Sequence, residues 1–564
     1  MNAPLPVPPI WTTGTTEGIH TGTWRAATPR HLFAPAPCHK ACPVNGEIAT
    51  WIGQARGGDL QGAWQTLMRH NPFPAIAGRI CHHPCESACN RAGYDEALSI
   101  CRLERFIGDA ALDAGWMPPP PTEAAAGRVA IIGGGPAGLS AAYQLRRIGY
   151  AVTLFEASDA LGGVMRHGIP AYRLSRRVLD GEIARIVALG VDVRLQHPVQ
   201  GEEAMRAIAD AHDAVFVALG AQQPKRLPVL PDDVEWAMDG ATYLAACSRG
   251  QAPALGPRVV VVGGGSAAID VARSARRQGH SVSLLSLERE AQMPAQREEV
   301  VEALEEGIGL VDGAMLRAVR ETGATALDAS RLALQCVRVD FRPGAERGRF
   351  EIVEIADSGF ELPADAVITA IGQDPRLDDL GGALRREGAL LWTAGAGATS
   401  DERVWAGGDL TSMARFVTEA VGMGKRAALA IDRSLRERGL GASGPALVLD
   451  DDGDEPVVPL SAISLHYHPR RARAVSPRRA AAERVADEAE VQLGLDAAAA
   501  LAETTRCFSC GTCINCDHCV IYCPDLAIER VGMGYTVNTD YCKGCGVCVR
   551  ECPTGSMAMS EDTK

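Results

Sequence analysis

The sequence of 564 residues contains no apolar run long enough to cross a lipid bilayer and only 5 lysines. Its 51 arginines are scattered and its net charge is −13, so we expect no broad nucleic-acid-binding face. The first ten residues are rich in proline but have no basic flank and no apolar core, so we expect no secretory signal. These absences favour a cytoplasmic protein that binds neither nucleic acid nor a membrane.

The middle of the chain has almost no cysteine. Of the 18 cysteines, only Cys247 and Cys336 lie between Cys101 and Cys507. Without an export signal a disulfide framework is not expected, and thiols at short gaps indicate metal ligands. The other sixteen (18 minus 2) could form four sites of four. They are Cys38, Cys42, Cys81, Cys85, Cys89 and Cys101, and Cys507, Cys510, Cys513, Cys516, Cys519, Cys523, Cys542, Cys545, Cys548 and Cys552.

From Arg128 to about Asp432, apolar runs rich in β-branched residues alternate with amphipathic stretches, a pattern typical of parallel sheets in α/β domains. The PPPP run at 118–121 indicates a linker before this region, and acidic then basic residues at 445–480 indicate another after it. Leu493–Arg506 is expected to be helical. The predicted strands include Val129–Ile132, Ala151–Phe155, Ala214–Leu219, Val259–Val262 and Ala366–Ala370.

Residues 129–145 (VAIIGGGPAGLSAAYQL) place a G-x-G-x-x-G motif between an apolar strand and a helix. Its glycines allow a tight turn, close approach of a pyrophosphate and close helix packing, while the helix N-terminus faces the phosphates. Glu156 follows the next strand, where a carboxylate binds ribose hydroxyls. The alternative is that these glycines serve only the packing of the turn and bind no dinucleotide. The candidate dinucleotide-binding residues are Gly133, Gly135, Pro136, Ala137, Gly138 and Glu156.

Residues 258–288 repeat the pattern, with Ala268 in place of the third glycine. Glu288 follows the next strand, and an acid there favours a free 2′-hydroxyl and repels a 2′-phosphate. We therefore predict NAD(H), with NADP less favoured; the alternative for Glu288 is a solvated charge at a strand end. The candidate residues of this second site are Gly263, Gly265, Ser266, Ala267 and Glu288.

Two such units, 130 residues apart, suggest FAD and a nicotinamide. Residues 404–410 (VWAGGDL) resemble the late flavin motif of disulfide-reductase-like flavoproteins, which implies that Asp409, beside Gly408, binds the ribityl chain. The resemblance also implies that a helix from about Arg415 points at the flavin. Residues 368–375, with Gly372, resemble the turn where the chain re-enters the FAD domain; Gly163 is a further candidate. Residues 127–440 contain no C-x-x-C, so thiol–disulfide chemistry is not expected.

The last cysteines form two C-x2-C-x2-C-x3-C-P runs, the pattern of bacterial ferredoxins with two [4Fe-4S] clusters. In that pattern the fourth cysteine of each run ligates the other cluster. The alternative, a pair of zinc sites, is disfavoured because zinc sites usually space their cysteine pairs more widely. The expected ligand sets are Cys513, Cys516, Cys519 and Cys552, and Cys542, Cys545, Cys548 and Cys523.

Residues 36–440 resemble the small subunit of bacterial glutamate synthase and the N-terminal half of dihydropyrimidine dehydrogenase. The two dinucleotide motifs carry this resemblance, together with PCHKACP (37–43), NPFPAIAGRICHHPCESAC (71–89) and GGVMRHGIPAYRL (162–174). The resemblance implies a helical domain with two [4Fe-4S] clusters beside an FAD domain into which an NAD(P) domain is inserted.

The sequence departs from this family in its first cysteine pair, which usually precedes the motif seen at Cys38. RCFSCG (506–511) looks like that missing pair, so we expect a first cluster on Cys38, Cys89, Cys507 and Cys510. The second would use Cys42, Cys81, Cys85 and either Cys101 or Glu104, since the family often has Gln or Glu there. Cys101 is favoured because all sixteen clustered cysteines are then ligands. The alternative is that Cys507 and Cys510 are spare thiols, so we expect three to four clusters.

A second departure concerns the nucleotide. NADPH-using relatives tend to carry Tyr-Arg-Arg after the second Rossmann strand, where this chain has Ser286, Leu287 and Glu288. Loss of both arginines removes a phosphate clamp and supports NAD(H), although Arg289 is nearby.

The predicted fold is α/β multidomain: a helical N-terminal Fe-S domain, an FAD Rossmann-like domain with an inserted NAD Rossmann-like domain, and a C-terminal bacterial-ferredoxin-like α+β domain. We expect an N-terminal arm and Fe-S domain at residues 1–126, and the FAD-binding domain in two parts at 127–235 and 363–440. The NAD(P)-binding domain, the linker and the ferredoxin-like domain are expected at residues 236–362, 441–500 and 501–564.

Nicotinamide gives two electrons as hydride, an iron–sulfur cluster accepts one, and a flavin can do both. We therefore predict an NAD(P)H:acceptor oxidoreductase that passes electrons between NAD(H), FAD and clusters, to or from a ferredoxin or a catalytic subunit such as a 2-oxoacid:acceptor oxidoreductase. No motif places a catalytic residue. Two alternatives remain: a glutamate synthase small subunit serving a glutamine-dependent large subunit, and a non-catalytic assembly module with structural clusters.

Overall fold

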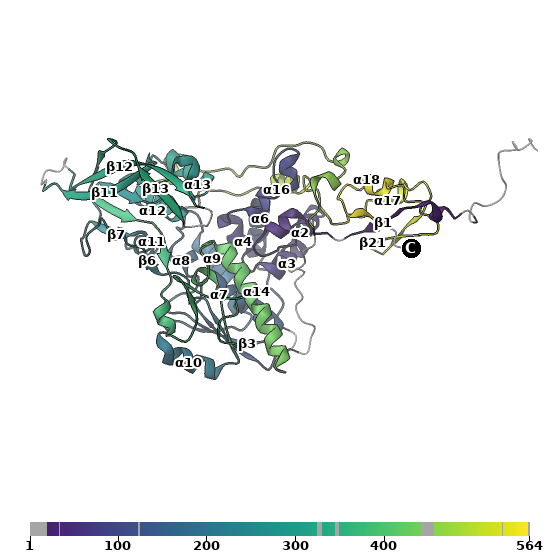
Figure 1. The fold of residues 1–564 in the computed structure, drawn as a ribbon, viewed down its shortest axis with the longest axis horizontal. Helices are drawn as coiled ribbons and strands as arrows, with labels where there is room; N and C mark the ends of the chain where they lie inside the picture. Colours follow the sequence, from purple (N-terminus) through teal and green to yellow (C-terminus); the bar gives the residue numbers. More distant parts are fainter. Residues whose placement is uncertain are drawn as a thin grey trace, which may run out of the picture.

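The structure is a computed structural model that describes Gly18 and residues 20–561, apart from residues 33, 122–123, 324–329, 345–348, 443–455 and 533. Most of the expected N-terminal arm and the acidic run at 450–455 lie outside the described residues. Two parallel sheets occupy the centre of the sequence, with short helices before them and a small antiparallel unit after them (Figure 1). The predicted α/β class with parallel sheets is confirmed.

The first parallel sheet has the strand order β19-β5-β2-β3-β4. Its valines, isoleucines and alanines are buried because helices cover the sheet. Helices α7 (Pro136–Ile148) and α14 (Val417–Glu437) pack against each other and against this sheet. The strands are β2 (Arg128–Ile132), β3 (Ala151–Phe155), β4 (Asp192–Arg194), β5 (Ala214–Val217) and β19 (Val404–Ala406).

The second parallel sheet is inserted between β5 and β19 of the first and has the order β10-β9-β8-β15-β7. An antiparallel sheet of β11 (Ala314–Glu321), β12 (Leu332–Pro343), β13 (Phe350–Glu354) and β14 (Phe360–Ala364) packs beside it. Its helices include α12 (Ser266–Arg277) and α13 (Arg297–Glu305). Its strands are β7 (Ala237–Asp239), β8 (Arg258–Val262), β9 (Ser281–Leu285), β10 (Gly309–Val311) and β15 (Ala366–Thr369).

The two cysteine-rich ends are built differently. The N-terminal helices bury apolar side chains, including Trp51 and Trp64, in one core with the first parallel sheet. The C-terminal unit contains β20 (Ile528–Val531), β21 (Gly534–Val537) and β22 (Met557–Glu561), and β1 (Ala27–His31) pairs with β22. The N-terminal helices are α1 (Pro37–Ala41), α2 (Ile48–Arg56), α3 (Leu60–His70), α4 (Pro74–Ile80), α5 (Pro84–Ser87) and α6 (Ile100–Asp113).

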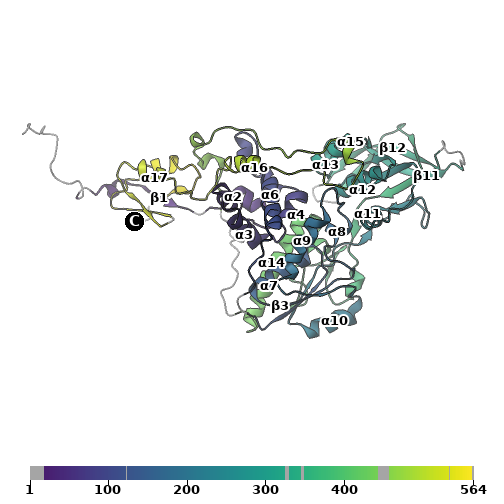
Figure 2. The same cartoon turned by 180° about the vertical axis from the view of Figure 1, so that it is seen from behind.

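Residues 456–506, the return segment, connect α14 to the C-terminal unit by a long excursion (Figure 2). Near its start, Ser464 N–H donates to the Cys552 carbonyl at 3.1 Å. At α15 (Ala481–Arg484) it reaches the second sheet's helix α13, where Arg484 pairs with Glu305 at 2.7 Å. It then returns through α16 (Ala497–Thr504) to the N-terminal helices. This segment thus contacts the C-terminal unit, the inserted region and the N-terminal helices.

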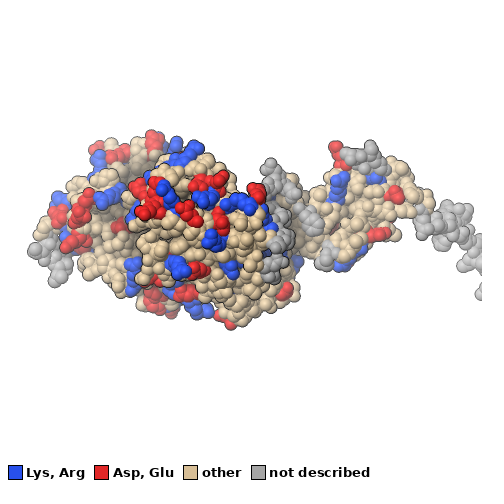
Figure 3. Space-filling model, turned by 90° about the horizontal axis from the view of Figure 1, so that it is seen from below, with Lys and Arg blue, Asp and Glu red and all other residues tan. Residues whose placement is uncertain are grey.

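Charges of both signs are interspersed on the surface shown in Figure 3, where no large field of one sign is seen. Within the described parts of the chain, no helix combines the length and apolarity needed to span a membrane.

Candidate functional site

The turn between β2 and α7 is shaped by glycines. Gly133 has a φ of +108°, and a Cβ there would collide with the Ala218 carbonyl. A Cβ on Gly138 would collide with the Gly133 carbonyl, so α7 can approach β2 only with glycine at this position. A Cβ on Gly135, in contrast, would meet nothing within 4 Å. This open space at the α7 N-terminus, beside Pro136 at the first helical position, fits a pyrophosphate.

Glu156 lies against the same turn. Its Oε2 accepts a hydrogen bond from Gly134 N–H at 2.7 Å, and its Oε1 accepts one from Ser158 N–H at 2.8 Å. Gly163 closes the turn from another side, because a Cβ on it would lie 2.9 Å from the Gly135 Cα. The predicted residues of the first dinucleotide site are therefore adjacent in space.

The late motif lies at the same place. Gly408 and Asp409 form the short helix η5 (Gly408–Leu410), and a Cβ on Gly408 would lie 3.2 Å from the Ala137 Cβ. Burial raises the pKa of Asp409, while Arg415 opposes this shift. A buried carboxyl beside an open glycine turn fits the ribityl and phosphate groups of FAD, and α14 begins eight residues after Asp409.

The second turn, between β8 and α12, has the same form. Gly263 has a φ of +144°, Gly265 again faces open space, and Ser266 and Ala267 begin α12. Glu288 lies at the turn: its Oε2 accepts from Ser286 Oγ at 2.7 Å and would collide with a Cβ on Gly264.

Two further residues that the sequence singles out are Arg289, the neighbour of Glu288, and Gly372. Arg289 forms an ion pair with Asp312 at 3.8 Å and is half-exposed. Gly372 follows β15, and its carbonyl accepts from Lys225 N–H at 3.0 Å. Gly372 therefore lies where the chain leaves the second parallel sheet and returns toward the first.

The C-terminal unit contains two hollows, each bordered by four cysteines. One is lined by Cys513, Cys516, Cys519 and Cys552, and the other by Cys523, Cys542, Cys545 and Cys548. These are the two interlocked sets expected for a pair of [4Fe-4S] clusters. Burial, followed by repulsion from neighbouring cysteines, raises the pKa of Cys519 to about 12. Cationic iron would relieve that repulsion, so the residues fit the group.

Four cysteines from distant parts of the chain meet at the N-terminal helices. Burial raises the pKa of Cys38 well above its usual range, and Cys507, Cys89 and Cys510 raise it further by repulsion. Burial and Cys507 likewise raise the pKa of Cys510 to about 12. Asn90 Nδ2 donates to Cys510 Sγ at 3.4 Å. The proposed return of Cys507 and Cys510 to Cys38 and Cys89 therefore agrees with where these thiols lie.

The other N-terminal group contains Cys42, Cys81, Cys85 and Glu104. Burial, then Glu104 and Cys81, raise the pKa of Cys42 to about 12, and Cys42, Cys81 and Glu104 add to the effect of burial on Cys85. Burial raises the pKa of Glu104 to about 8, and Asn71 Nδ2 donates to its Oε1 at 2.9 Å.

Cys101 lies beside this group in a different setting. Its Sγ donates to the Ala77 carbonyl at 3.3 Å, and it is hydrogen-bonded to Cys81. Among the described residues, no group of three or more His, Cys, Asp or Glu side chains is arranged to hold a single metal ion. The thiols around a [4Fe-4S] cluster stand farther apart, because the whole cluster lies between them.

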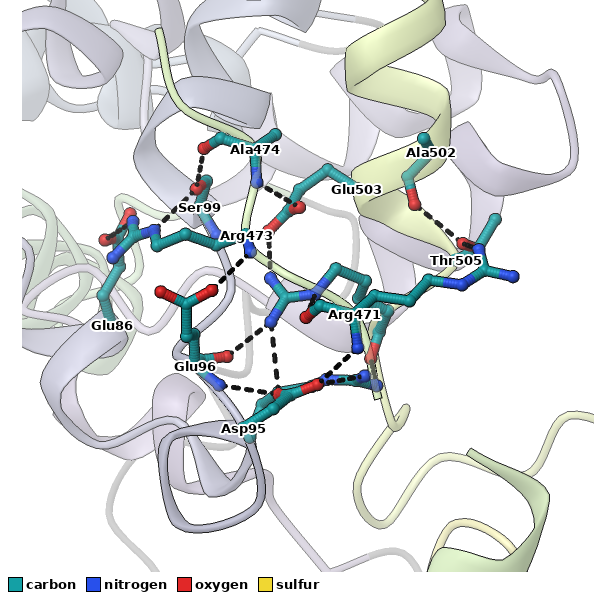
Figure 4. Close-up of polar contacts among 12 residues, drawn as sticks. Glu86, Asp95, Glu96, Ser99, Arg471, Arg473, Ala474, Ala502, Glu503 and Thr505 are labelled. Carbon is teal, nitrogen blue, oxygen red and sulfur yellow. Dashed lines mark hydrogen bonds and ion pairs between the residues drawn. The ribbon is translucent and has the colours of Figure 1, made fainter. Parts of the chain in front are cut away.

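Buried ion pairs hold the segment that precedes the returning cysteines, and Figure 4 shows the polar contacts around Asp95, Glu96 and Glu503. Arg506, next to Cys507, is 2% exposed and pairs with Glu503 at 2.7 Å and Asp95 at 3.2 Å. It also donates to the Glu96 carbonyl at 2.7 Å, while Arg91 donates to the Arg506 carbonyl. The backbone before the pair is thus fixed to the N-terminal helices.

The earlier part of the return segment is bound to the same helices. Arg473 donates to Glu86 at 2.7 Å and to Ser99 Oγ at 3.0 Å. Glu503 accepts hydrogen bonds from the backbone N–H groups of Ser99 and Ala474, both at 2.8 Å (Figure 4). These anchoring residues could not be predicted from the sequence, because each partner is distant along the chain and no local spacing indicates it.

Two glycine turns on parallel sheets, flanked by cysteine groups, define a two-dinucleotide oxidoreductase with iron–sulfur domains. Three family models match the chain: pyridine nucleotide-disulphide oxidoreductase over residues 127–424, dihydropyrimidine dehydrogenase domain II with a 4Fe-4S cluster over 27–116, and a 4Fe-4S dicluster domain over 512–556. The first covers more than half of the sequence, so the chain belongs to the pyridine nucleotide-disulphide oxidoreductase family.

Several curated proteins are similar over most of the chain. The NADP(+)-dependent formate dehydrogenase subunit beta of Moorella thermoacetica is 36% identical over 511 residues, covering 85% of this chain and 71% of that protein. The NAD-dependent dihydropyrimidine dehydrogenase subunit PreT of Escherichia coli K12 is 32% identical, covering 72% and 92%. The glutamate synthase [NADPH] small chain of Mycobacterium tuberculosis is 31% identical, covering 71% and 85%.

These matches confirm the predicted resemblance to glutamate synthase small subunits and dihydropyrimidine dehydrogenase. They also confirm the prediction of an electron-transfer oxidoreductase with FAD/NAD(P) and [4Fe-4S] domains. The names of the relatives include both NAD- and NADP-dependent proteins, so they do not select the nucleotide.

Proposed function

We propose that the chain is the NADH-oxidising electron-transfer subunit of a larger oxidoreductase. Bound FAD would accept hydride from nicotinamide and release its electrons singly to iron–sulfur clusters. The observation that carries the proposal is the position of α14, which packs on α7 at the first glycine turn and begins beside Cys81 of the second N-terminal group. The flavin and cluster sites therefore share one helix.

The preference for NADH rests on Glu288. Its carboxylate lies at the glycine turn, where it can accept hydrogen bonds from a free 2′-hydroxyl and would repel a 2′-phosphate. Arg289 is paired with Asp312, so its charge is partly offset by a neighbouring carboxylate. The side chains around this turn therefore favour NADH over NADPH.

We propose four [4Fe-4S] sites. The C-terminal sites use the two interlocked sets, and the first N-terminal site uses Cys38, Cys89, Cys507 and Cys510. For the second N-terminal site, Cys42, Cys81 and Cys85 are joined by Glu104 rather than Cys101. The Glu104 carboxylate raises the pKa of both Cys42 and Cys85, whereas the Cys101 thiol donates to the Ala77 carbonyl and is hydrogen-bonded to Cys81. This choice differs from the one that cysteine counting favours.

We propose that the partner is a catalytic subunit that receives electrons from the C-terminal unit. That unit projects from the end of the molecule opposite the inserted sheet (Figure 1), and Cys545, which lines one of its two hollows, is exposed. The relatives named as subunits of formate dehydrogenase and dihydropyrimidine dehydrogenase support this role. A free ferredoxin as acceptor is the remaining possibility, and the same surface would serve it.

The test is anaerobic mixing of purified protein with NADH or NADPH while flavin and cluster absorbance are followed. We expect NADH to bleach the flavin first and the clusters afterwards, at least tenfold faster than NADPH. A Glu288→Gln variant keeps the hydrogen-bonding shape but removes the charge, so it should reduce this preference. Faster bleaching by NADPH in the unaltered protein would contradict the nucleotide assignment. Bleaching of the flavin without bleaching of the clusters would contradict the proposed electron transfer from FAD to the clusters.

A further inference from the structure

The first turn of helix α14 contains a residue that none of the motifs quoted above includes. Thr418, in its first turn, donates a hydrogen bond from Oγ1 to the Sγ of Cys81 at 3.2 Å. Thr418 is 4% exposed and Cys81 is 8% exposed, so water does not compete freely for this bond. The hydroxyl therefore joins the flavin-side helix directly to a cysteine of the second N-terminal group.

Neighbouring contacts hold the two partners in place. The ring of Phe416 stacks on that of His82 with centroids 3.9 Å apart, and His82 Nε2 lies 4.0 Å from Glu419 Oε1. On the other side, Gln296 Nε2 donates to the Cys81 carbonyl at 3.4 Å. The start of α14 is thus fixed to the loop that carries Cys81, and the inserted nucleotide region contacts the same residue.

A hydrogen bond to a cluster sulfur changes how easily the cluster is reduced. Reduction adds negative charge to the cluster and its thiolates, and a donor stabilises that charge more in the reduced state than in the oxidised state. Donors to the sulfurs therefore raise the reduction potential. Cys81 Sγ has further hydrogen-bond partners: the backbone N–H of His83 donates to it at 3.4 Å, and the side chains of Cys101 and His82 are also hydrogen-bonded to it. All of these remain when Thr418 is substituted.

We propose that Thr418 is a positioning residue that raises the reduction potential of the second N-terminal cluster and so makes this cluster the entry point for electrons from the flavin. The inference rests on the proposed function, because it requires Cys81 to ligate a cluster. The transfer moves one electron from the flavin to the cluster. No covalent bond changes at Thr418 or Cys81, the threonine proton stays on its oxygen, and any proton lost by the flavin passes to water.

The test is a potentiometric titration of the purified holoprotein, followed by EPR, with Thr418→Val as the main variant. Valine keeps the shape of threonine and removes the donor. We expect one cluster to become harder to reduce by roughly tenfold in its equilibrium constant, which is about 59 mV for one electron. The other clusters should keep their potentials, and Thr418→Ser should restore the wild-type value because serine keeps the hydroxyl.

A matched control is available on α7, the helix that packs against α14. Ser140 is fully buried, and its Oγ donates to the Val421 carbonyl of α14 at 2.8 Å without contacting a cysteine. Ser140→Ala should leave all potentials unchanged. Equal potentials in Thr418→Val and wild type, a similar shift in Ser140→Ala, or loss of iron from Thr418→Val would each overturn the proposal. Failure of the proposed function would be seen separately, as absence of this cluster from the wild-type protein.

Discussion

The two cysteine-rich ends of this protein reach similar chemistry by opposite routes. At the C-terminus, the eight cysteines around the two hollows lie within residues 513–552, so short loops determine their positions. At the N-terminus, Cys38 and Cys89 meet Cys507 and Cys510 only after the chain has built both parallel sheets and the return segment. One end is specified by local spacing, and the other depends on tertiary structure.

The difference extends to what stabilises each end. The C-terminal cysteines form a small apolar core with Ile528, Tyr535 and Met557. The N-terminal assembly relies on buried charges at the return segment. Although burial opposes it, hydrogen bonds from Arg91 and from backbone N–H groups hold the pKa of Asp95 well below its usual range. Asp95 is therefore ionised between Arg91 and Arg506, and the first N-terminal cluster should be the more sensitive to mutations far from it.

The largest effect is expected from removing the returning pair. A Cys507→Ala, Cys510→Ala double variant should lose about four iron atoms per chain, because one [4Fe-4S] cluster loses half of its ligands. The EPR signals of the C-terminal clusters should persist. Cys247→Ala, which lies outside both groups, is the control and should keep its iron. Full iron content in the double variant would show that the two ends are independent.

Removing the anchor next to that pair should have the second largest effect. Arg506→Met removes the buried cation that pairs with Glu503 and that shares Asp95 with Arg91, which costs on the order of 3–5 kcal/mol. We expect the first N-terminal cluster to be lost at lower denaturant concentration, with the C-terminal clusters unaffected. Arg479→Met in the same segment is the control, since Arg479 pairs with the exposed Asp487 and should change nothing measurable. Equal behaviour of the two variants would refute the anchoring role.

The identity of the fourth ligand in the second N-terminal group gives a smaller and more specific effect. Glu104→Ala should remove this cluster or change its EPR spectrum, while Cys101→Ala should leave the spectrum close to wild type. Iron analysis and EPR of the two single variants distinguish the ligands. The reverse pattern would assign Cys101 and restore the assignment that cysteine counting favours.

The smallest effect is expected at the nucleotide turn, where the substitution changes no cysteine. Glu288→Arg should raise the rate with NADPH relative to NADH by about tenfold, since it replaces a repelling charge with one that pairs with a 2′-phosphate. Iron and flavin contents should not change. Stopped-flow reduction with each nucleotide measures this ratio, and an unchanged ratio would mean that Glu288 does not select the nucleotide.

The strands and helices that could be predicted from the sequence are those that a short local pattern determines. The strand predicted at Val129–Ile132 corresponds to β2 (Arg128–Ile132), because an apolar run before a glycine turn is a local signal. The helix predicted at Leu493–Arg506 is shorter, since Gly494 adopts a φ of +81° and Asp496 caps α16 by accepting from Ala499 N–H. No local pattern indicates that β1 pairs with β22.

In the candidate site, too, local features could be predicted from the sequence and contacts between distant residues could not. Both glycine turns and both ferredoxin runs lie where their spacing predicts. The basic residues of the expected linker look like solvated charges in the sequence, yet Arg473 pairs with Glu86 and Arg484 with Glu305. Thr418 belongs to none of the motifs that the sequence shows. These contacts join residues between 179 and 387 positions apart, so only the folded chain reveals them.

The central claim is that the chain carries four clusters, one of them shared between its two ends. The most direct test is iron, sulfide and FAD analysis of anaerobically purified protein, combined with Mössbauer spectroscopy. We expect about sixteen iron atoms and one FAD per chain, all of the iron in [4Fe-4S] clusters. About eight iron atoms, confined to the C-terminal unit, would contradict it.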